Sequence, residues 1–202
     1  MAEHIRLTPE TERAAVEAAT RTLRAGGIAF LPAEGVYGLH ARADLPAAMS
    51  KLRAIKPRGP GKGTIALLST PSELDAWCGP VGPEVRALVA AHWPGALTLV
   101  LPALPRVPGA LVASDGTVAL RCPGSDFLRS VVADAGGLVV STSANAPGEG
   151  PAVTATGAIA EQADLVVDAG RLEGKPSTVV SVEKGAVRVL REGAARVKPG
   201  HP

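Results

Sequence analysis

The chain has 202 residues, of which 46% are hydrophobic, 20% are charged and 2% are aromatic, so it can build one domain around a core of Ala, Val, Leu and Ile. The formal net charge of +2 is too small to indicate a nucleic-acid-binding protein by itself. Two cysteines are too few for a disulfide-stapled scaffold, and their context gives no zinc motif.

The first predicted element is a helix after residues 1–7. Thr8 can cap this helix, Pro9 suits its first turn, and Gly26-Gly27 end it. The start of the chain lacks the basic segment and the apolar run of a signal peptide, and no apolar stretch approaches the length of a membrane span. We therefore expect a cytoplasmic protein with no membrane contact.

Short apolar runs and helical stretches alternate along the rest of the chain. The predicted strands are 28–31, 64–68, 97–101, 118–121, 138–141, 165–167, 178–182 and 187–190, and the predicted helices are 45–55, 72–78, 83–92, 126–135 and 157–162. A loop at 32–38 follows the first strand, and a hairpin around Lys184-Gly185 joins the last two strands.

Because strands and helices alternate without a strict pattern, we expect an α/β (α+β mixed) fold in which helices flank a mixed sheet. The chain has no internal repeat and no change of composition, so a single domain over 1–202 is expected. Its core would cover about 8–195, and the tail at 196–202 would be frayed.

The first candidate site is a block of basic residues between Asp44 and Glu73, where no acidic residue occurs: Lys51, Arg53, Lys56, Arg58 and Lys62. Pro and Gly residues at 57–63 can bring backbone amides close to an anion, which the cations neutralise. A phosphate group is the expected ligand, and the alternative is a solvated basic loop. The block is not a Walker A loop, because Gly63 stands where Ser or Thr is required.

The second candidate site is a polar string that follows the predicted strand at 138–141, with the side chains of Ser141, Thr142, Ser143 and Asn145. Hydroxyl and amide groups at the end of a strand can bind phosphate oxygens or a ribose. The alternative is a turn in which they cap backbone groups. A Ser-His-Asp hydrolase is not indicated, because no GxSxG elbow surrounds Ser143.

Two weaker features complete the candidates. Tyr37, the only tyrosine, either contacts a ligand or is a packed ring with a satisfied hydroxyl. Ser177-Thr178 and the later Arg191 are common strand-edge residues, which carry little weight in isolation.

In chain order, however, the motifs form one series: PAEGVYGL, Lys56-Pro57-Arg58 with Lys62, Arg121-Cys122-Pro123, Ser143-Ala144-Asn145 with Gly148, Ser177-Thr178-Val179-Val180, and Arg191. From about Ile28 to Gly193 the chain therefore resembles the YrdC-like family, the threonylcarbamoyl-AMP synthases, in their short single-domain form. The resemblance implies a twisted mixed sheet around a basic cavity. It implies that L-threonine, bicarbonate and ATP react to give threonylcarbamoyl-AMP and pyrophosphate for the t6A37 modification of tRNA.

The resemblance also implies roles for individual residues. Catalysis would fall to Lys56, Arg58, Ser143 and Asn145, ATP binding to the same four with Lys62, Thr117 and Arg191, and threonine binding to Arg121, Ser141, Ser177 and Tyr37. Mg²⁺ would accompany the triphosphate, although no protein ligand for a metal is evident. Further partners would be tRNA or double-stranded RNA and the proteins that transfer the product.

Two other hypotheses stay open. The first is a YrdC-like protein that binds double-stranded RNA or nucleotides without efficient synthase activity, through the basic block; the scarcity of aromatic residues for stacking argues against it. The second is a carbamoyl-transfer relative with another acceptor. Ala33 stands where the family has threonine, which removes a hydroxyl from the expected threonine pocket, and Ser181 stands where the family has aspartate.

Overall fold

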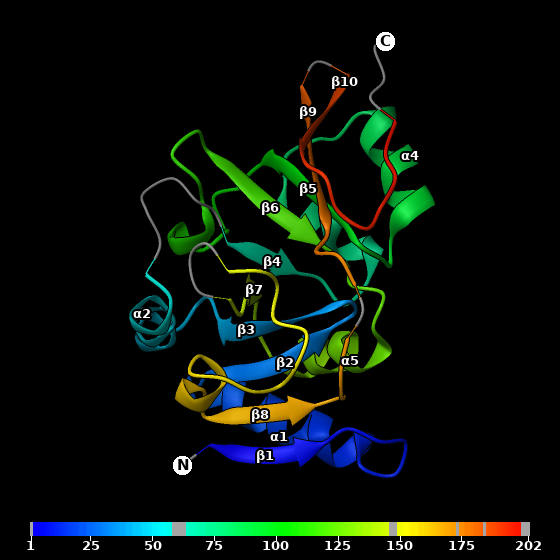
Figure 1. Cartoon of the computed structure of the whole chain (residues 1–202). Coiled ribbons are helices and arrows are strands. Elements are labelled where there is room, and N and C mark those ends of the chain that lie inside the picture. Colours follow the sequence, from blue (N-terminus) through cyan, green and yellow to red (C-terminus); the bar gives the residue numbers. More distant parts are fainter. Residues whose placement is uncertain (1, 58–63, 146–148, 173, 184, 199–202) are drawn as a thin grey trace.

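The computed structural model describes residues 2–57, 64–145, 149–172, 174–183 and 185–198. These ranges form a ten-stranded sheet with helices on both faces (Figure 1). The strands are β1 (Glu3–Arg6), β2 (Ala29–Ala33), β3 (Val36–Arg42), β4 (Ile65–Leu67), β5 (Leu97–Pro102), β6 (Thr117–Arg121), β7 (Val139–Ser143), β8 (Leu165–Asp168), β9 (Thr178–Glu183) and β10 (Ala186–Arg191). The α-helices are α1 (Glu12–Arg24), α2 (Pro46–Ile55), α3 (Leu74–Trp77), α4 (Pro83–His92) and α5 (Asp126–Asp134), and the short 3-10 helices are η1 (Pro71–Glu73), η2 (Gly109–Leu111) and η3 (Ala160–Gln162).

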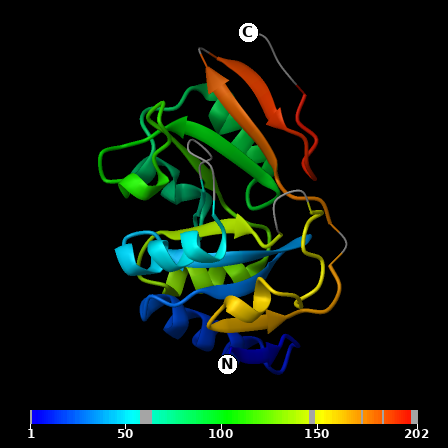
Figure 2. The ribbon, with the colours of Figure 1, turned by 60° about the vertical axis from the view of Figure 1, so that its left-hand side comes forward.

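The strand order is β1-β8-β2-β3-β7-β4-β6-β5-β9-β10. β8 pairs in parallel with β1 and β2, β4 with β6, and β5 with β9, whereas the other pairs are antiparallel. The sheet twists, so that β9 and β10 run in a different direction from β1 and β8 (Figures 1 and 2). This mixed, twisted sheet confirms the predicted fold class.

The two faces of the sheet pack on different helices. On one face, alternate residues of β2, β7 and β8 form a core with α1 and α5, which includes Leu23, Leu31, Val131, Val139 and Leu165. The opposite face packs on α2 and α4. Because α1 and α5 cover only part of the first face (Figure 1), its continuation over β4, β6 and β5 is free to form a site.

The predicted loop at 32–38 is wrong, because these residues form a hairpin. β2 and β3 pair in antiparallel register up to a turn of Glu34 and Gly35. Glu34 has a positive φ of 63°, which residues with a side chain rarely adopt. Pro32 indicated a break, but β8 pairs with β2 only as far as Phe30, so the proline lies where that side of β2 is unpaired.

Three predicted helices also differ from the structure. The N-cap of α1 is Thr11 and not Thr8, because Thr11 Oγ1 donates a hydrogen bond to Arg6 O and accepts one from Thr8 N, which closes a turn before the helix. The predicted helix at 72–78 is divided into η1 and the single turn α3. The predicted helix at 157–162 contributes only the 3-10 helix η3.

The other elements agree with the prediction, apart from small shifts at their ends. α4 has the predicted bounds, and β9 and β10 form the predicted hairpin. β7 extends to Ser143, so this residue lies in a strand rather than a loop. β1 was not predicted, because its sequence is polar. Within the tail that was predicted to be frayed at 196–202, Val197 packs against the core. None of the helices that the structure describes is long and apolar enough to cross a membrane.

Candidate functional site

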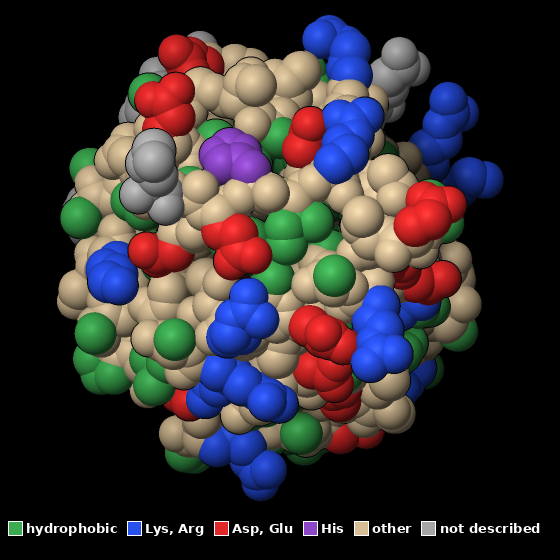
Figure 3. Space-filling view, turned by 90° about the horizontal axis from the view of Figure 1, so that it is seen from below, with side chains coloured by type: hydrophobic (Ala, Val, Ile, Leu, Met, Phe, Trp, Pro, Cys, Tyr) green, Lys and Arg blue, Asp and Glu red, His purple; other side chains and the backbone are tan. Residues whose placement is uncertain are grey.

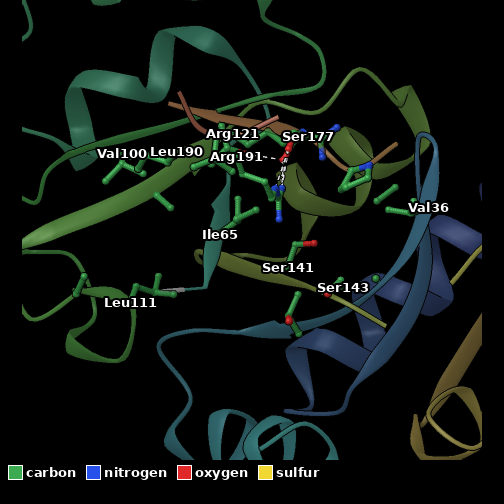
Figure 4. A pocket seen from close by; sticks show the side chains of 18 of the residues that line it. Val36, Ile65, Val100, Leu111, Arg121, Ser141, Ser143, Ser177, Leu190 and Arg191 are labelled. Atoms are coloured by element: carbon green, nitrogen blue, oxygen red, sulfur yellow. Dashed lines mark hydrogen bonds between the residues drawn. The ribbon is translucent and has the colours of Figure 1, made fainter. Parts of the chain in front are cut away.

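A cavity of about 350 Å³ opens on the part of the sheet face that α1 and α5 leave uncovered (Figure 4). The strands β3 to β7, β9 and β10 contribute to its lining. Its walls include seven of the predicted site residues: Tyr37, Thr117, Arg121, Ser141, Ser143, Ser177 and Arg191. Side chains that are scattered over more than 150 residues of sequence therefore meet in one concave site, as a small-molecule pocket requires.

Strand alternation explains how these side chains reach the pocket. Ile65 of β4 lies opposite Ser141 of β7 on one side and opposite Ala119 of β6 on the other, so all three point to the same face. On β7, Val139 lies two residues before Ser141 and packs under the helices. The first polar side chain of the string, Ser141, therefore lies just beyond the part of the sheet face that α1 and α5 cover.

One edge of the pocket joins the basic block to the polar string. Lys56 Nζ donates hydrogen bonds to Ser143 O, to Ser143 Oγ at 2.8 Å and to Asn145 Oδ1 at 3.2 Å. Lys56 ends α2, whereas Ser143 ends β7, and the contact brings a cation, a hydroxyl and an amide together. Arg58 and Lys62 lie outside the described residues.

The buried cation of the pocket is Arg121, which is 7% exposed. Its Nη2 lies 2.5 Å from Glu34 Oε2, and its Nε donates to Gly95 O at 3.0 Å. The other Glu34 oxygen, Oε1, accepts a hydrogen bond from Gly124 N. Burial lowers the pKa of the Arg121 guanidinium, and the Glu34 charge opposes that shift. Glu34 was not predicted as a site residue, because its contact with Arg121 joins residues that are far apart in the sequence.

The second guanidinium is Arg191, which is anchored on neutral groups. Its Nη2 donates to Ser177 O at 2.6 Å and to Ser177 Oγ at 3.1 Å, and Ser177 Oγ shares a hydrogen bond with Thr98 Oγ1 at 2.8 Å. Desolvation lowers the pKa of Arg191. Within the described ranges no carboxylate lies at ion-pair distance from it. Its charge can therefore neutralise an anionic ligand.

The side chain of Tyr37 is used inside the protein. Its ring is fully buried and stacks on Phe30 with ring centroids 5.3 Å apart. Its hydroxyl donates to Gly170 O at 2.6 Å and accepts from Ala169 N at 2.9 Å. Desolvation raises the pKa of Tyr37 to about 12. Tyr37 borders the pocket, but of its two interpretations the structure favours the packed ring.

The pocket has a polar and an apolar side (Figure 4). Ser141 and Ser143 lie on one side, and Val100, Leu111 and Leu190 lie on the other. Thr117 lies in the lining with Asp115, to which its hydroxyl donates a hydrogen bond of 2.6 Å. Hydroxyls and cations beside an apolar wall suit a ligand that is anionic at one end and apolar at the other.

Such a pocket on the face of a twisted mixed sheet defines an α/β protein with a small-molecule site that is suited to an anion. The family model Sua5_yciO_yrdC, described as "Telomere recombination", matches residues 21–193. The chain belongs to this family, which confirms the resemblance drawn from its motifs.

Relatives resemble the chain over most of its length. A threonylcarbamoyl-AMP synthase from Alkalilimnicola ehrlichii is 36% identical over 187 residues, which cover 89% of this chain and 97% of that protein. A synthase of the same name from Chromohalobacter salexigens is 33% identical and covers 83% of this chain and 92% of its own length.

Two solved structures have the same fold. Sua5 from P. abyssi, crystallised in complex with L-threonine, superposes with a TM-score of 0.85 at 27% identity; the match covers 96% of this chain and 57% of that one, so this chain spans little more than half of Sua5. YciO from E. coli superposes with a TM-score of 0.86 at 25% identity, over 98% of this chain and 99% of that one.

Proposed function

We propose that the protein is a threonylcarbamoyl-AMP synthase, which forms threonylcarbamoyl-AMP and pyrophosphate from L-threonine, bicarbonate and ATP. The names of its relatives support this activity. The observation that carries it is the contact of Lys56 with Ser143 and Asn145 at the edge of a pocket that also contains Arg121 and Arg191. The enzyme would be a nucleotidyltransferase of the cytoplasm, and further proteins would transfer its product to tRNA.

The cations and hydroxyls have a direct role in this reaction. The amine of threonine first combines with bicarbonate to form N-carboxy-threonine, and water is released. A carbamate oxygen of this intermediate then forms a bond to the α-phosphorus of ATP, and the bond from that phosphorus to the pyrophosphate oxygen breaks. The negative charge that shifts to phosphate oxygens needs positioned donors more than it needs a general base. Lys56, Ser143 and Asn145 hold the triphosphate from one edge, and Arg191 neutralises it from another. Arg58 and Lys62 would add to the first group.

The amino acid belongs beside Arg121. Glu34 and Gly95 hold Nη2 and Nε of its guanidinium, whereas Nη1 makes no hydrogen bond within the ranges that the structure describes. Nη1 of Arg121 would bind the carboxylate of threonine, with Ser141 and Ser177 nearby. Because Glu34 already balances the Arg121 charge, this end of the pocket suits a zwitterion, and the Arg191 end suits the more highly charged ATP.

Magnesium would enter this site on the triphosphate. No group of three or more His, Cys, Asp or Glu side chains that could hold a metal occurs in the described part of the chain. Its oxygen ligands would therefore come from ATP and water, and no step of the reaction is assigned to a protein-bound metal.

The surface that Figure 3 shows does not favour RNA binding. The face around β1 and α1 has acidic and basic side chains intermixed (Figure 3), and some of them form exposed ion pairs such as Arg6–Asp168 and Arg13–Glu17. Proteins usually bind a phosphate backbone through a clustered basic patch or stripe, which this face does not have.

The test is to incubate the protein with ATP, bicarbonate and a mixture of amino acids, and to identify the adenylate by mass spectrometry while pyrophosphate is measured. We expect threonylcarbamoyl-AMP, and we expect Lys56→Ala to abolish it. Lys51→Ala is the matched control, because Lys51 is an exposed residue of the same helix. No adenylate from a protein that binds ATP, or normal turnover by Lys56→Ala, would contradict the proposal.

A further inference from the structure

A short chain of hydrogen bonds runs from the pocket into the core and ends on a threonine. Arg191 Nη2 donates to Ser177 O at 2.6 Å and to Ser177 Oγ at 3.1 Å (Figure 4). Ser177 Oγ lies 2.8 Å from Oγ1 of Thr98, a residue of β5. All three residues border the cavity, but Thr98 is fully buried. Thr98 can therefore act on a ligand only through Ser177.

The backbone of Ser177 is held in place by the chain that follows β10. Ala194 N donates a hydrogen bond of 2.9 Å to Pro176 O. A Cβ atom at Gly193 would lie 2.3 to 2.5 Å from backbone atoms of residues 176–178, so this part of the tail rests directly on the segment that contains Ser177. With the backbone fixed, the direction of the Ser177 hydroxyl proton is what its neighbours still decide.

The proton between the two hydroxyls belongs on Thr98. Among the described residues, Ser177 Oγ is the one hydrogen-bond partner of Thr98 Oγ1. If Ser177 donated, the proton of the fully buried Thr98 would have no acceptor, and a buried donor without a partner is strongly disfavoured. The Ser177 hydroxyl borders the cavity, so its own proton can reach a ligand or water.

This direction leaves the Ser177 hydroxyl with one remaining capacity. Its oxygen accepts from Thr98 and from Arg191, which uses both of its lone pairs. Its proton has no acceptor within the described ranges and is available to an oxygen atom in the cavity.

We infer from this geometry that Thr98 is a positioning residue: it donates to Ser177 Oγ and thereby commits the Ser177 hydroxyl to donate to an oxygen of the bound amino acid. This inference rests on the proposed function, which places threonine beside Ser177. Thr98 itself does not touch the substrate. Without its hydroxyl, Ser177 could turn its proton away from the ligand, and the amino acid would lose one hydrogen bond.

The experiment measures kcat and the KM values of threonine and ATP for the wild type, Thr98→Val and Thr98→Ser. Valine keeps the branched shape that suits a strand and removes the hydroxyl. We expect Thr98→Val to raise the KM of threonine by about three-fold to ten-fold, as for one lost hydrogen bond. The KM of ATP should change less, because Arg191 keeps the Ser177 carbonyl, and Thr98→Ser should restore the KM of threonine.

Thr20→Val is the matched control. Thr20 is a buried threonine of α1, and its hydroxyl has no hydrogen-bond partner among the described residues. The same change of side chain should therefore leave both KM values at the wild-type level.

A double-mutant cycle shows whether Thr98 acts through Ser177. In a Ser177→Ala protein, Thr98→Val should not raise the KM of threonine any further, and an additive increase would overturn the inference. An unchanged KM in Thr98→Val, an equal rise of both KM values, or a failure of Thr98→Ser to restore the KM would overturn it as well.

A neutron structure of the deuterated wild-type protein tests the proton direction without turnover or substitution. Deuterium on Thr98 Oγ1 that points to Ser177 Oγ would support the inference, and deuterium on Ser177 Oγ that points to Thr98 would overturn it. A wild-type protein that forms no adenylate from threonine would refute the proposed function, whereas the neutron structure would still decide the direction of this hydrogen bond. The two failures are therefore distinguishable.

Discussion

Replacement of His40 by leucine tests a titratable group that lies directly beneath the pocket. His40 is fully buried on β3, opposite Ser141, and neither ring nitrogen has a hydrogen-bond partner. Burial lowers the pKa of His40 to about 4, and the Arg121 charge adds to the shift. The backbone at Ala29 and Gly38 opposes the shift, although neither residue forms a hydrogen bond of normal geometry with the ring.

The sign of the pH dependence follows from this lowered pKa. The imidazole is neutral in the folded protein, whereas in the unfolded chain it takes up a proton below its ordinary pKa of 6.5. Above pH 6.5 the imidazole is neutral in both states and does not reduce the stability of the fold. As the pH falls from 6.5 toward 4, the proton binds only to the unfolded chain, so the free energy of unfolding decreases. Linkage predicts that this residue costs the wild-type protein about 2 kcal/mol of unfolding free energy between pH 7 and pH 5.

The assay is urea denaturation at pH 7, 6 and 5. His40→Leu should be at least as stable as the wild type at pH 7, because it removes two unsatisfied buried nitrogens, and it should lose about 2 kcal/mol less by pH 5. His4→Gln, a change of an exposed histidine, is the control and should keep the wild-type slope. Parallel stability curves for the wild type and His40→Leu would refute the reasoning, as would a folded-state pKa above 6 for His40 by NMR.

Two further predictions follow from close contacts at the hairpin turn. Glu34→Gln leaves the buried Arg121 charge uncompensated, so we expect the free energy of unfolding in urea to fall by about 3 kcal/mol. We also expect the KM for threonine to rise more than kcat falls. An unchanged KM would show that the Glu34–Arg121 pair has no role in substrate binding. Gly174→Ala places a methyl group 2.1 Å from the Cα of Gly35, so we expect a loss of about 2 kcal/mol in thermal melting, whereas Gly109→Ala, with nothing within 4 Å, should melt as the wild type does.

The strands and longer helices could be predicted because their signals are local. The apolar run at 138–140 and the amphipathic stretch at 83–92 each needed only neighbouring residues, and both form the expected elements. The hairpin at Glu34-Gly35 could not be read in this way. Its turn is stabilised by a hydrogen bond from Gly174 N to Gly35 O at 3.0 Å, which joins residues far apart in the sequence.

The candidate site shows the same division. Ser141 to Ser143 of the polar string and two arginines, Arg121 and Arg191, were visible as residue types, and they line the pocket. The counter-charge of Arg121 and the apolar wall were not visible. Glu34 can be recognised as a site residue only in the structure, where the turn places it 2.5 Å from Arg121. In the sequence Leu190 is an ordinary apolar strand residue, whereas in the structure it lies at a register shift in β10 and lines the pocket.

The pocket exists because one face of the sheet packs on α1 and α5 at one end of its strands and stays open to a ligand at the other. On β7 the side chains Val139, Ser141 and Ser143 all point to that face, and only the first is covered by helices. On β4 the pair is Leu67 and Ile65, again with only the first fully buried. A net charge of +2 therefore says little about this protein, because its chemistry depends on where the helix layer stops and which cations remain on the open part of the face.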